Sequence, residues 1–472
     1  MRLEAGITVM PEYVQAEGVD AVLERVADIA RATSVTTSPY VVSVAPEGTG
    51  HREPPADAEA GGKRLLDRAL WGRRELWMTA SSSFRPDLAR YEGLTYRPPE
   101  TDATTEADGP VVGSFLDAAG DRGLKTWLQI QAAIPPCHRV QFGGPVDADQ
   151  PLMPDGRAFT GRVDKNASLA SADLRAYMRA FVGDLWRAYP MIGGFRFDWP
   201  EYPAYHFEAL FFDFNPQVAR FASGLGLDFE GLRAGCAAFL AELGDGSARR
   251  RKIALDDLDA FRADIFAAYP ALSEMIALRT AVVTEYGWFL REIVEEASGG
   301  RAGVFLQCFP PPLNEATGFD IAAQSANADL IGVKAYTMHW PMIEADILGA
   351  LRSRADFAPE SVARALSRLL ALSPDAPRDP SGIRYPEPDE AHPAASADIA
   401  AKMRTARGQV ARGTVMCGVT HGYGPLEDVR RRFDAVAEGA GGVVEINRYG
   451  YLSDAKLEAI GARVAAARPD AT

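Results

Sequence analysis

The feature that most constrains the fold is an alternation of short apolar strands with amphipathic helices along all 472 residues. Eight segments have the length and apolar content of strands buried on both faces, and at least one helix pattern follows each of them. These strands are Leu3–Met10, Ser34–Ala45, Lys125–Gln131, a segment beginning at Gly193, Gly303–Phe309, Asp329–Tyr336, Thr414–Thr420 and Gly442–Asn447. The alternation predicts an α/β protein, a (β/α)₈ barrel. A doubly wound open sheet would alternate in the same way, but no GxGxxG turn follows the first strand.

The barrel is expected to form a single domain over residues 1–472, with two large additions. A long loop excursion at 45–110 follows the second strand, and a helical insertion at 205–268 follows the fourth. Loops of that length are usually functional or disordered, and the aromatic residues of the first addition argue against disorder.

The fourth strand begins the most polar motif in the chain. Side chains alternate along a strand, so Arg196 and Asp198 share one face while Phe195 and Phe197 share the other. Pro200 ends the strand, because proline has no N–H to donate to a ladder. The structural interpretation is a buried Arg196–Asp198 ion pair. Since buried charges are costly unless they are paired or used, a functional site is the preferred interpretation.

Polar or aromatic side chains stand near the carboxyl ends of most of the predicted strands. In a barrel these ends meet at one face, where active sites are built. One such residue is usually structural, but their coincidence on six or seven strands indicates an enzyme. Beyond the fourth-strand motif the residues are Glu12, Gln131, Gln307, Lys334, Tyr336, His339, Trp340, His421, Tyr423, Glu445 and Asn447.

Carboxylates at that face predict glycoside cleavage, which needs one carboxylic acid and one carboxylate across the scissile bond. We expect Asp198 to be the nucleophile or electrostatic stabiliser and Glu201 to be the acid/base, with Glu445 as the alternative second carboxylate. Retaining chemistry is preferred, and inversion stays open. The residues expected to bind the carbohydrate or orient the carboxylates are Arg196, Trp199, Tyr202, Gln131, Gln307, Lys334, Tyr336, His339, Trp340, His421, Tyr423, Asn447 and Glu12.

The run GGFRFDWPEYP at 193–203 resembles the fourth-strand signature of TIM-barrel glycoside hydrolases. Its FRFD core is similar to the α-amylase superfamily pattern, in which an arginine stands two residues before the nucleophilic aspartate. Its DW and EYP parts are similar to the chitinase-type DWEYP motif, in which the glutamate is the acid. Tyr336 stands where chitinase-type barrels carry a tyrosine at the end of strand six. The overall likeness, to hypothetical bacterial glycoside hydrolase barrels, implies a carbohydrate substrate.

Three positions depart from those patterns. Pro200 lengthens the motif to DxxE, and Gln307 stands near the place of the acidic residue that the amylase pattern expects on strand five. His421 ends strand seven, where an aspartate is expected. These departures keep open the alternative that the chain is a catalytically degenerate barrel, which binds carbohydrate without cleaving it.

A class I aldolase or lyase is the second enzymatic interpretation. It would use Lys334 on strand six to form a Schiff base, since a barrel interior can depress the pKa of a lysine. No phosphate-binding glycine-rich turn supports this interpretation, and the long aromatic loops suit oligosaccharides better.

Composition limits the partners. A net charge of −14 disfavours nucleic acid and anionic membranes, and it leaves the oligomeric state open. No cofactor is predicted, and the histidines show no HxH or HExxH spacing, so we expect no catalytic metal. Four scattered cysteines and the lack of a signal segment in this chain favour a cytoplasmic location.

Overall fold

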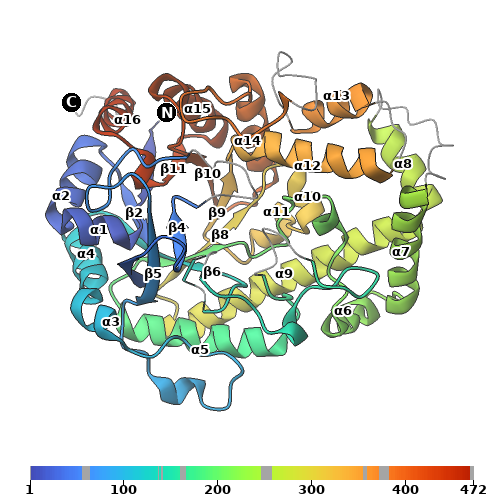
Figure 1. Ribbon diagram of the computed structural model, residues 1–472, viewed down its shortest axis with the longest axis horizontal. Coiled ribbons are helices and arrows are strands. Elements are labelled where there is room, and N and C mark those ends of the chain that lie inside the picture. Colours follow the sequence, from blue (N-terminus) through green and yellow to red (C-terminus); the bar gives the residue numbers. More distant parts are fainter. Residues whose placement is uncertain are drawn as a thin grey trace.

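The computed structural model describes residues 2–55, 64–136, 138–139, 142–159, 166–245, 258–354, 359–370 and 382–467. Eight parallel strands form a closed barrel surrounded by helices, which is the predicted α/β fold (Figure 1). Every predicted strand is present, and the spatial order follows the chain until β11 closes on β1. The barrel strands are β1 (Glu4–Thr8), β2 (Ser34–Thr37), β6 (Lys125–Gln131), β7 (Gly194–Asp198), β8 (Gly303–Cys308), β9 (Leu330–Lys334), β10 (Val415–His421) and β11 (Val443–Asn447).

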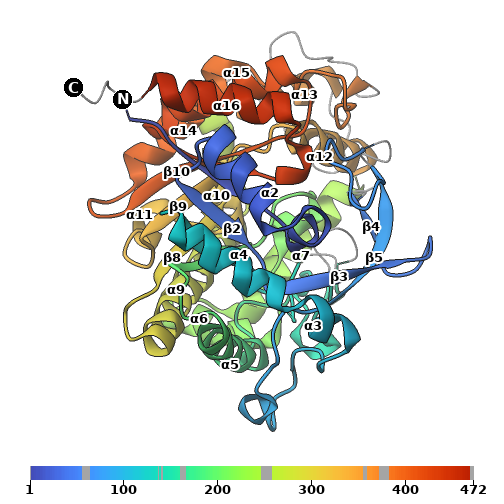
Figure 2. The same ribbon diagram turned by 90° about the vertical axis from the view of Figure 1, so that its left-hand side faces the viewer.

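The second predicted strand is in fact two strands. Ser34–Thr37 belongs to the barrel, but the chain then leaves it, and β3 (Tyr40–Ala45) pairs antiparallel with β5 (Leu76–Ser82). Together with β4 (His51–Glu53) they form a small sheet in the order β3-β5-β4, seen along one side of the molecule in Figure 2. The prediction of one continuous strand was therefore wrong, because the partner that draws β3 away lies more than 30 residues further along the chain. Residues 56–63 of this excursion lie outside the described part.

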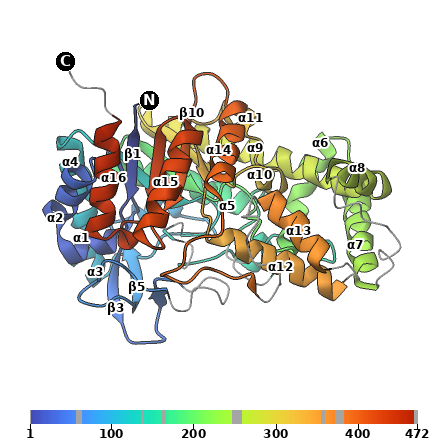
Figure 3. The same cartoon turned by 90° about the horizontal axis from the view of Figure 1, so that it is seen from above.

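Helices cover the outside of the barrel. They are α1 (Pro11–Glu17), α2 (Val19–Leu23), α3 (Ala103–Asp108), α4 (Pro110–Asp121), α5 (Ala172–Ala188), α6 (Ala219–Gly224), α7 (Phe229–Asp245), α8 (Leu258–Ala268), α9 (Pro270–Ser298), α10 (Leu313–Thr317), α11 (Ile321–Gln324), α12 (His339–Arg354), α13 (Pro359–Leu370), α14 (Ser396–Gln409), α15 (Leu426–Ala440) and α16 (Asp454–Ala466). A π-helical turn, Glu24–Ile29, extends α2, and helix α14 was not predicted. Figure 3 shows α6, α7 and α8, from the insertion after β7, at the end of the molecule opposite α16.

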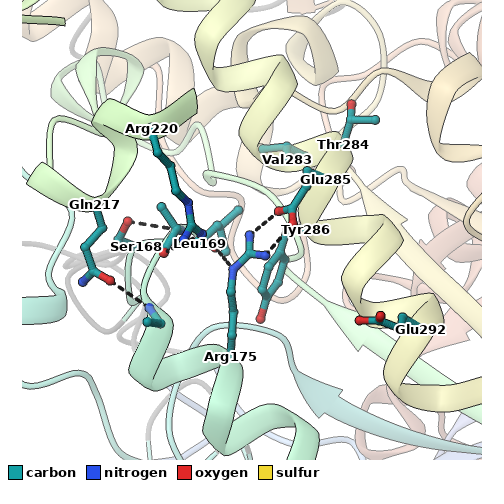
Figure 4. A network of polar contacts seen from close by, with 12 residues as sticks. Ser168, Leu169, Arg175, Gln217, Arg220, Val283, Thr284, Glu285, Tyr286 and Glu292 are labelled. Carbon is teal, nitrogen blue, oxygen red and sulfur yellow. Dashed lines mark hydrogen bonds and ion pairs between the residues drawn. The ribbon is translucent and has the colours of Figure 1, made fainter. Parts of the chain in front are cut away.

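Helices α5 and α9 flank the strand that carries the central motif. The hydroxyl of Ser171 caps α5 by accepting a hydrogen bond from Leu174 N. Arg175 on α5 then donates to both carboxylate oxygens of Glu285 on α9, and its guanidinium lies 5.2 Å from the centre of the Tyr286 ring (Figure 4). Arg175 Nε also donates to Leu169 O at 2.9 Å. This clamp holds α5 against α9, the helices that precede and follow β7 along the chain.

The barrel interior has a layer of aromatic side chains near the amino ends of the strands. The rings of Trp127 and Phe305 meet edge to face, with their centroids 5.4 Å apart. Gly194 must be glycine there, because a Cβ would lie 2.5 Å from the Trp127 ring. Above this layer the interior becomes polar, which is unusual for barrels whose interiors are dominated by branched aliphatic residues.

Within the described ranges no single helix is long and apolar enough to cross a membrane; segments 262–268 and 270–298 pass only as a pair bent by 102°. Cys236, Cys308 and Cys417 are buried free thiols, and Cys137 lies outside the described residues.

Candidate active site

A cavity of about 100 Å³ opens at the carboxyl ends of the barrel strands. Seven residues of the predicted site line it: Gln131, Asp198, Trp199, Tyr336, His339, His421 and Asn447. They come from β6, β7, β10 and β11, from the segments that directly follow β7 and β9, and from the first residue of α12. The prediction that these strand ends converge on one cavity is confirmed by the geometry, whereas their catalytic and binding roles stay predictions.

Asp198 faces the cavity and is held from behind by Lys334. The Lys334 ammonium lies 2.8 Å from Asp198 Oδ1 and 4.0 Å from Glu201 Oε1. Burial opposes the charge of Lys334, but Asp198 and Glu201 outweigh that effect, so the pKa of Lys334 is raised above its usual value. The lysine is therefore the cation of an ion pair, and its amine is kept protonated.

Glu201 is fully buried and keeps a proton near neutral pH. Burial raises its pKa to about 7, against the opposing effects of Lys334, the Thr317 hydroxyl and the Phe309 N–H. Phe309 N donates to Oε1 at 3.0 Å, and Thr317 Oγ1 lies 2.5 Å from Oε2 and 2.9 Å from Asn314 O. The hydrogen bonds from Phe309 and Thr317 and the charge of Lys334 favour the ionised form, so it is burial that keeps the proton on Glu201.

A polar row continues from Asp198 across the barrel. With the amide oriented to satisfy both neighbours, Gln307 donates to Asp198 Oδ1 at 2.9 Å and accepts from Arg196 Nε at 3.0 Å. Arg196 Nη1 lies 2.8 Å from Glu445 Oε1, which also accepts from Thr8 and from Thr36 at 2.9 Å. The Arg196–Asp198 ion pair considered from sequence does not form, since Arg196 binds Glu445 instead.

Trp199 adopts an unusual backbone conformation directly after Asp198. Its φ is +56°, in the left-handed region that bulky residues rarely occupy, and Pro200 follows it. Strained residues of this kind are held in place by surrounding structure and are frequent at functional sites. The reversal ends β7 and leaves both Asp198 and Trp199 in the cavity wall.

Nine predicted site residues do not line the cavity. They are Glu12, Arg196, Glu201, Tyr202, Gln307, Lys334, Trp340, Tyr423 and Glu445.

Several of these nine have structural partners elsewhere. Tyr202 donates to Asp213 Oδ2 at 3.0 Å, and Tyr423 donates to Pro386 O at 2.9 Å. Trp340 is buried with its ring centre 5.7 Å from Lys402 Nζ. Their aromatic rings therefore belong to the packing around the site.

The sequence analysis missed several lining residues. Arg64 and Arg139 lie on loops and Tyr451 ends the short 3₁₀ helix Tyr449–Tyr451, where no periodicity indicates which way a side chain points. Arg448 directly follows Asn447, so reading one residue beyond the eighth strand would have found it. The other missed lining residues are Met10, Pro55, Gln129, Tyr205 and Met338.

His421 presents a neutral imidazole to the cavity. Its Nδ1 accepts a hydrogen bond from Tyr423 N at 3.1 Å, which leaves the proton on Nε2. Burial, followed by the nearby Arg64, His339, Arg448 and Arg432, holds the pKa of His421 well below its usual value. This histidine can donate a hydrogen bond but is not a source of protons at neutral pH.

The fold and the cavity together define a (β/α)₈ barrel with a charged, aromatic-lined site at the face where such barrels build active sites. Within the part of the chain that the structure describes, no group of three His, Cys, Asp or Glu residues is placed to hold a metal ion.

Comparison with known proteins gives the same fold. The beta-galactosidase from the psychrophilic Marinomonas ef1 matches with a TM-score of 0.51 at 11% identity, over 97% of this chain and 58% of that one. The catalytic domain of a Paenibacillus polymyxa beta-amylase gives a TM-score of 0.48 at 10% identity, over 99% of each chain. No family model and no curated sequence matches. The neighbours are barrel glycoside hydrolases, and at this identity the likeness shows the fold alone.

Proposed function

We propose that this protein is a glycoside hydrolase in which the Asp198 carboxylate acts on the substrate. The observation that carries the proposal is that Asp198 is the one carboxylate lining the cavity among the described residues. It is paired with Lys334 and flanked by the rings of Trp199, Tyr205 and Tyr336. Such rings suit the apolar faces of a sugar.

Asp198 would act at the anomeric carbon. Glycoside cleavage passes through an oxocarbenium-like transition state, and a carboxylate beside it stabilises the positive charge or forms a glycosyl-enzyme intermediate. We favour the second course: the bond from Asp198 to the anomeric carbon forms as the bond to the leaving oxygen breaks, and that oxygen takes a proton from water, since no second carboxyl group lines the cavity among the described residues. A second water molecule then hydrolyses the glycosyl-enzyme, and the anomeric configuration is retained. The amides of Gln131 and Asn447 and the Nε2–H of His421 would bind sugar hydroxyls.

The other two predicted carboxyl groups support Asp198 indirectly. Glu201 holds its proton behind Lys334 and has both oxygens engaged, so we assign it to positioning the Lys334 ammonium. Glu445 holds Arg196, which orients the Gln307 amide on Asp198. The aldolase alternative receives no support, because a Schiff-base lysine needs a depressed pKa and that of Lys334 is raised.

The experiment is a screen of nitrophenyl glycosides and uronides, followed by kinetics of Asp198→Asn. This isosteric change should lower kcat/KM roughly 10³-fold or more. Because it also removes the counter-charge of the buried Lys334 ammonium, circular dichroism at the assay temperature must show that the variant is folded. The matched control is Asp329→Asn, the same change just before β9 at the opposite end of the barrel, which should keep its activity. Near-normal turnover by Asp198→Asn would refute the assignment, and sugar binding without turnover by the parent protein would identify a degenerate barrel.

A further inference from the structure

The cavity wall across from Asp198 carries arginines. In the closed barrel β11 is four strands away from β7 in either direction, so Arg448, directly after β11, lies on the opposite side of the mouth from Asp198. Arg448 and Arg139 both line the cavity and are only 7% and 6% exposed. A guanidinium is costly to bury unless negative charge accompanies it. The charges around these two arginines therefore indicate what the cavity can bind.

Two buried carboxylates stand behind the arginines. Glu53 forms an ion pair with each of them, and Glu12 Oε1 lies 3.2 Å from Arg139 Nη1 and 3.7 Å from Arg448 Nη2. Burial raises the pKa of Glu12, whereas Arg139 and Arg448 overcome the effect of burial on Glu53 and lower its pKa. Glu53 is thus the ionised carboxylate that balances the arginines, and both guanidiniums share it.

One donor of Arg448 remains open. Nη2 meets Glu53 and Glu12, but Nε is buried and makes no hydrogen bond with any residue that the structure describes. Gln131 Oε1, also on the cavity wall, is likewise buried without a donor there. An arginine recognises a carboxylate or sulfate through two neighbouring N–H groups, and Arg448 lines the cavity with one of its N–H groups unpaired.

The side chains around His421 also indicate the sign of the electrostatic potential at this wall. After burial, all four groups that most affect its pKa are basic side chains, Arg64 and Arg448 among them, and each lowers it. This wall is therefore electropositive although the whole chain has a net charge of −14. A local field opposite in sign to the net charge would draw an anion to this cavity.

We infer that the glycoside bound here carries an anionic substituent, a carboxylate as in a uronic acid or a sulfate, which rests against Arg448 and Arg139 across the barrel mouth from Asp198. The inference rests on the proposed function, since Asp198 marks the position of the anomeric carbon. One wall would then hold the charged substituent while the other acts on the glycosidic bond.

The test is isothermal titration of the full chain, at neutral pH, with matched pairs of sugars. The pairs are methyl glucuronide with methyl glucoside, methyl galacturonide with methyl galactoside, and each neutral glycoside with its sulfated counterpart. In at least one pair the charged member should bind roughly tenfold more tightly or better, as a charge-assisted fork would give. The uronide and sulfate arms decide which anion fits.

The readout is the ratio of the two affinities within a pair, and Arg448→Gln should bring that ratio close to one. Arg122→Gln, at the other end of the barrel, is the matched control and should keep the preference. Arg448→Lys retains a positive charge without the fork, and should keep only part of the preference while melting as the parent does. If Arg448→Gln does not fold, the parent and the lysine variant still decide the matter.

The outcomes separate this inference from the proposed function. Asp198-dependent cleavage of neutral glycosides with equal affinity for both members of every pair would overturn the anion site and leave the hydrolase intact. Tight uronide or sulfate binding that depends on Arg448, without any turnover, would support the anion site and refute the hydrolase. No preference in the parent protein, or a preference that survives Arg448→Gln, would overturn the inference.

Discussion

The two mouths of the barrel are built from the same eight strands but expose different chemistry. The mouth at the carboxyl ends holds the smaller cavity, about 100 Å³, lined by Asp198, arginines, amides and aromatic rings. The mouth at the amino ends holds a hollow of about 590 Å³. Its lining consists of Gly6, Ser34, Trp127, Phe305, Cys417 and other residues where the strands begin.

The volume of the two hollows therefore does not identify the active site. The hydrogen bonds and ion pairs of their polar side chains do. At the upper mouth Arg448 Nε and Gln131 Oε1 are buried without hydrogen-bond partners among the described residues. At the lower mouth Arg122 lies 3.3 Å from Asp28 and 3.7 Å from Asp20, in exposed ion pairs that water screens. Substitutions at the two mouths should therefore differ in how much they lower the free energy of unfolding and the activity.

Arg196→Met should have the largest effect on stability, because it leaves Glu445 buried and unpaired between the two mouths. Arg196 is fully buried, and its Nη1 lies 2.8 Å from Glu445 Oε1. Removing one member of a buried pair costs about 3–5 kcal/mol of unfolding free energy, measurable by urea denaturation. Adding Glu445→Met removes the unpaired carboxylate and should restore most of the lost unfolding free energy. A single variant as stable as the parent would show that this pair does not maintain the interior.

Glu201→Gln tests the neutral carboxyl group behind Lys334. The folded protein keeps this proton up to a pKa of about 7, whereas an ordinary glutamate loses it near 4.5. Folding thus takes up a proton between these values, and the free energy of unfolding falls as pH rises through that window, by about 3 kcal/mol in total. Glutamine cannot ionise, so the variant should lose this part of the pH dependence.

Kinetics then separate the two roles that Glu201 could have. A residue that only positions Lys334 should lower turnover of glycosides with good and poor leaving groups alike. A general acid would be needed mainly for poor leaving groups. Selective loss on poor leaving groups, or a stability profile that keeps its fall between pH 4.5 and 7, would contradict our assignment.

The barrel was predictable because its strands carry their own signal. Each is a short run buried on both faces, and proline or glycine separates it from the next element. Segment β5 carries no such signal: in LWMTASS the polar residues fall on both faces, and only its pairing with β3 makes it a strand. Helix α14 is alanine-rich with charges around its circumference, so its buried side against α15 and β10 left no clear stripe in the sequence.

At the site, alternation along a strand predicted which face of the strand a side chain points from. It did not predict how far the side chain lies from the mouth of the barrel. Asp198 and Asn447 were correctly placed on the inner face at the top of their strands. Glu445 shares the inner face with Asn447, but two residues earlier on a strand means about 7 Å deeper in the barrel, where Arg196 neutralises it. Arg139 depends on long-range contacts with Glu12 and Glu53, which no local pattern reveals.

Arg122→Gln should have the smallest effect and completes the comparison of the two mouths. Its side chain is 34% exposed, and both of its aspartate partners are more exposed still. Such pairs contribute about 0–1 kcal/mol, so we expect a change in unfolding free energy of about 0.5 kcal/mol or less, with kcat/KM unchanged. Raising the salt concentration should shrink even that difference, because exposed charges are screened. A large loss of activity from this variant would mean that the lower hollow takes part in function, and the distinction between the mouths would fail.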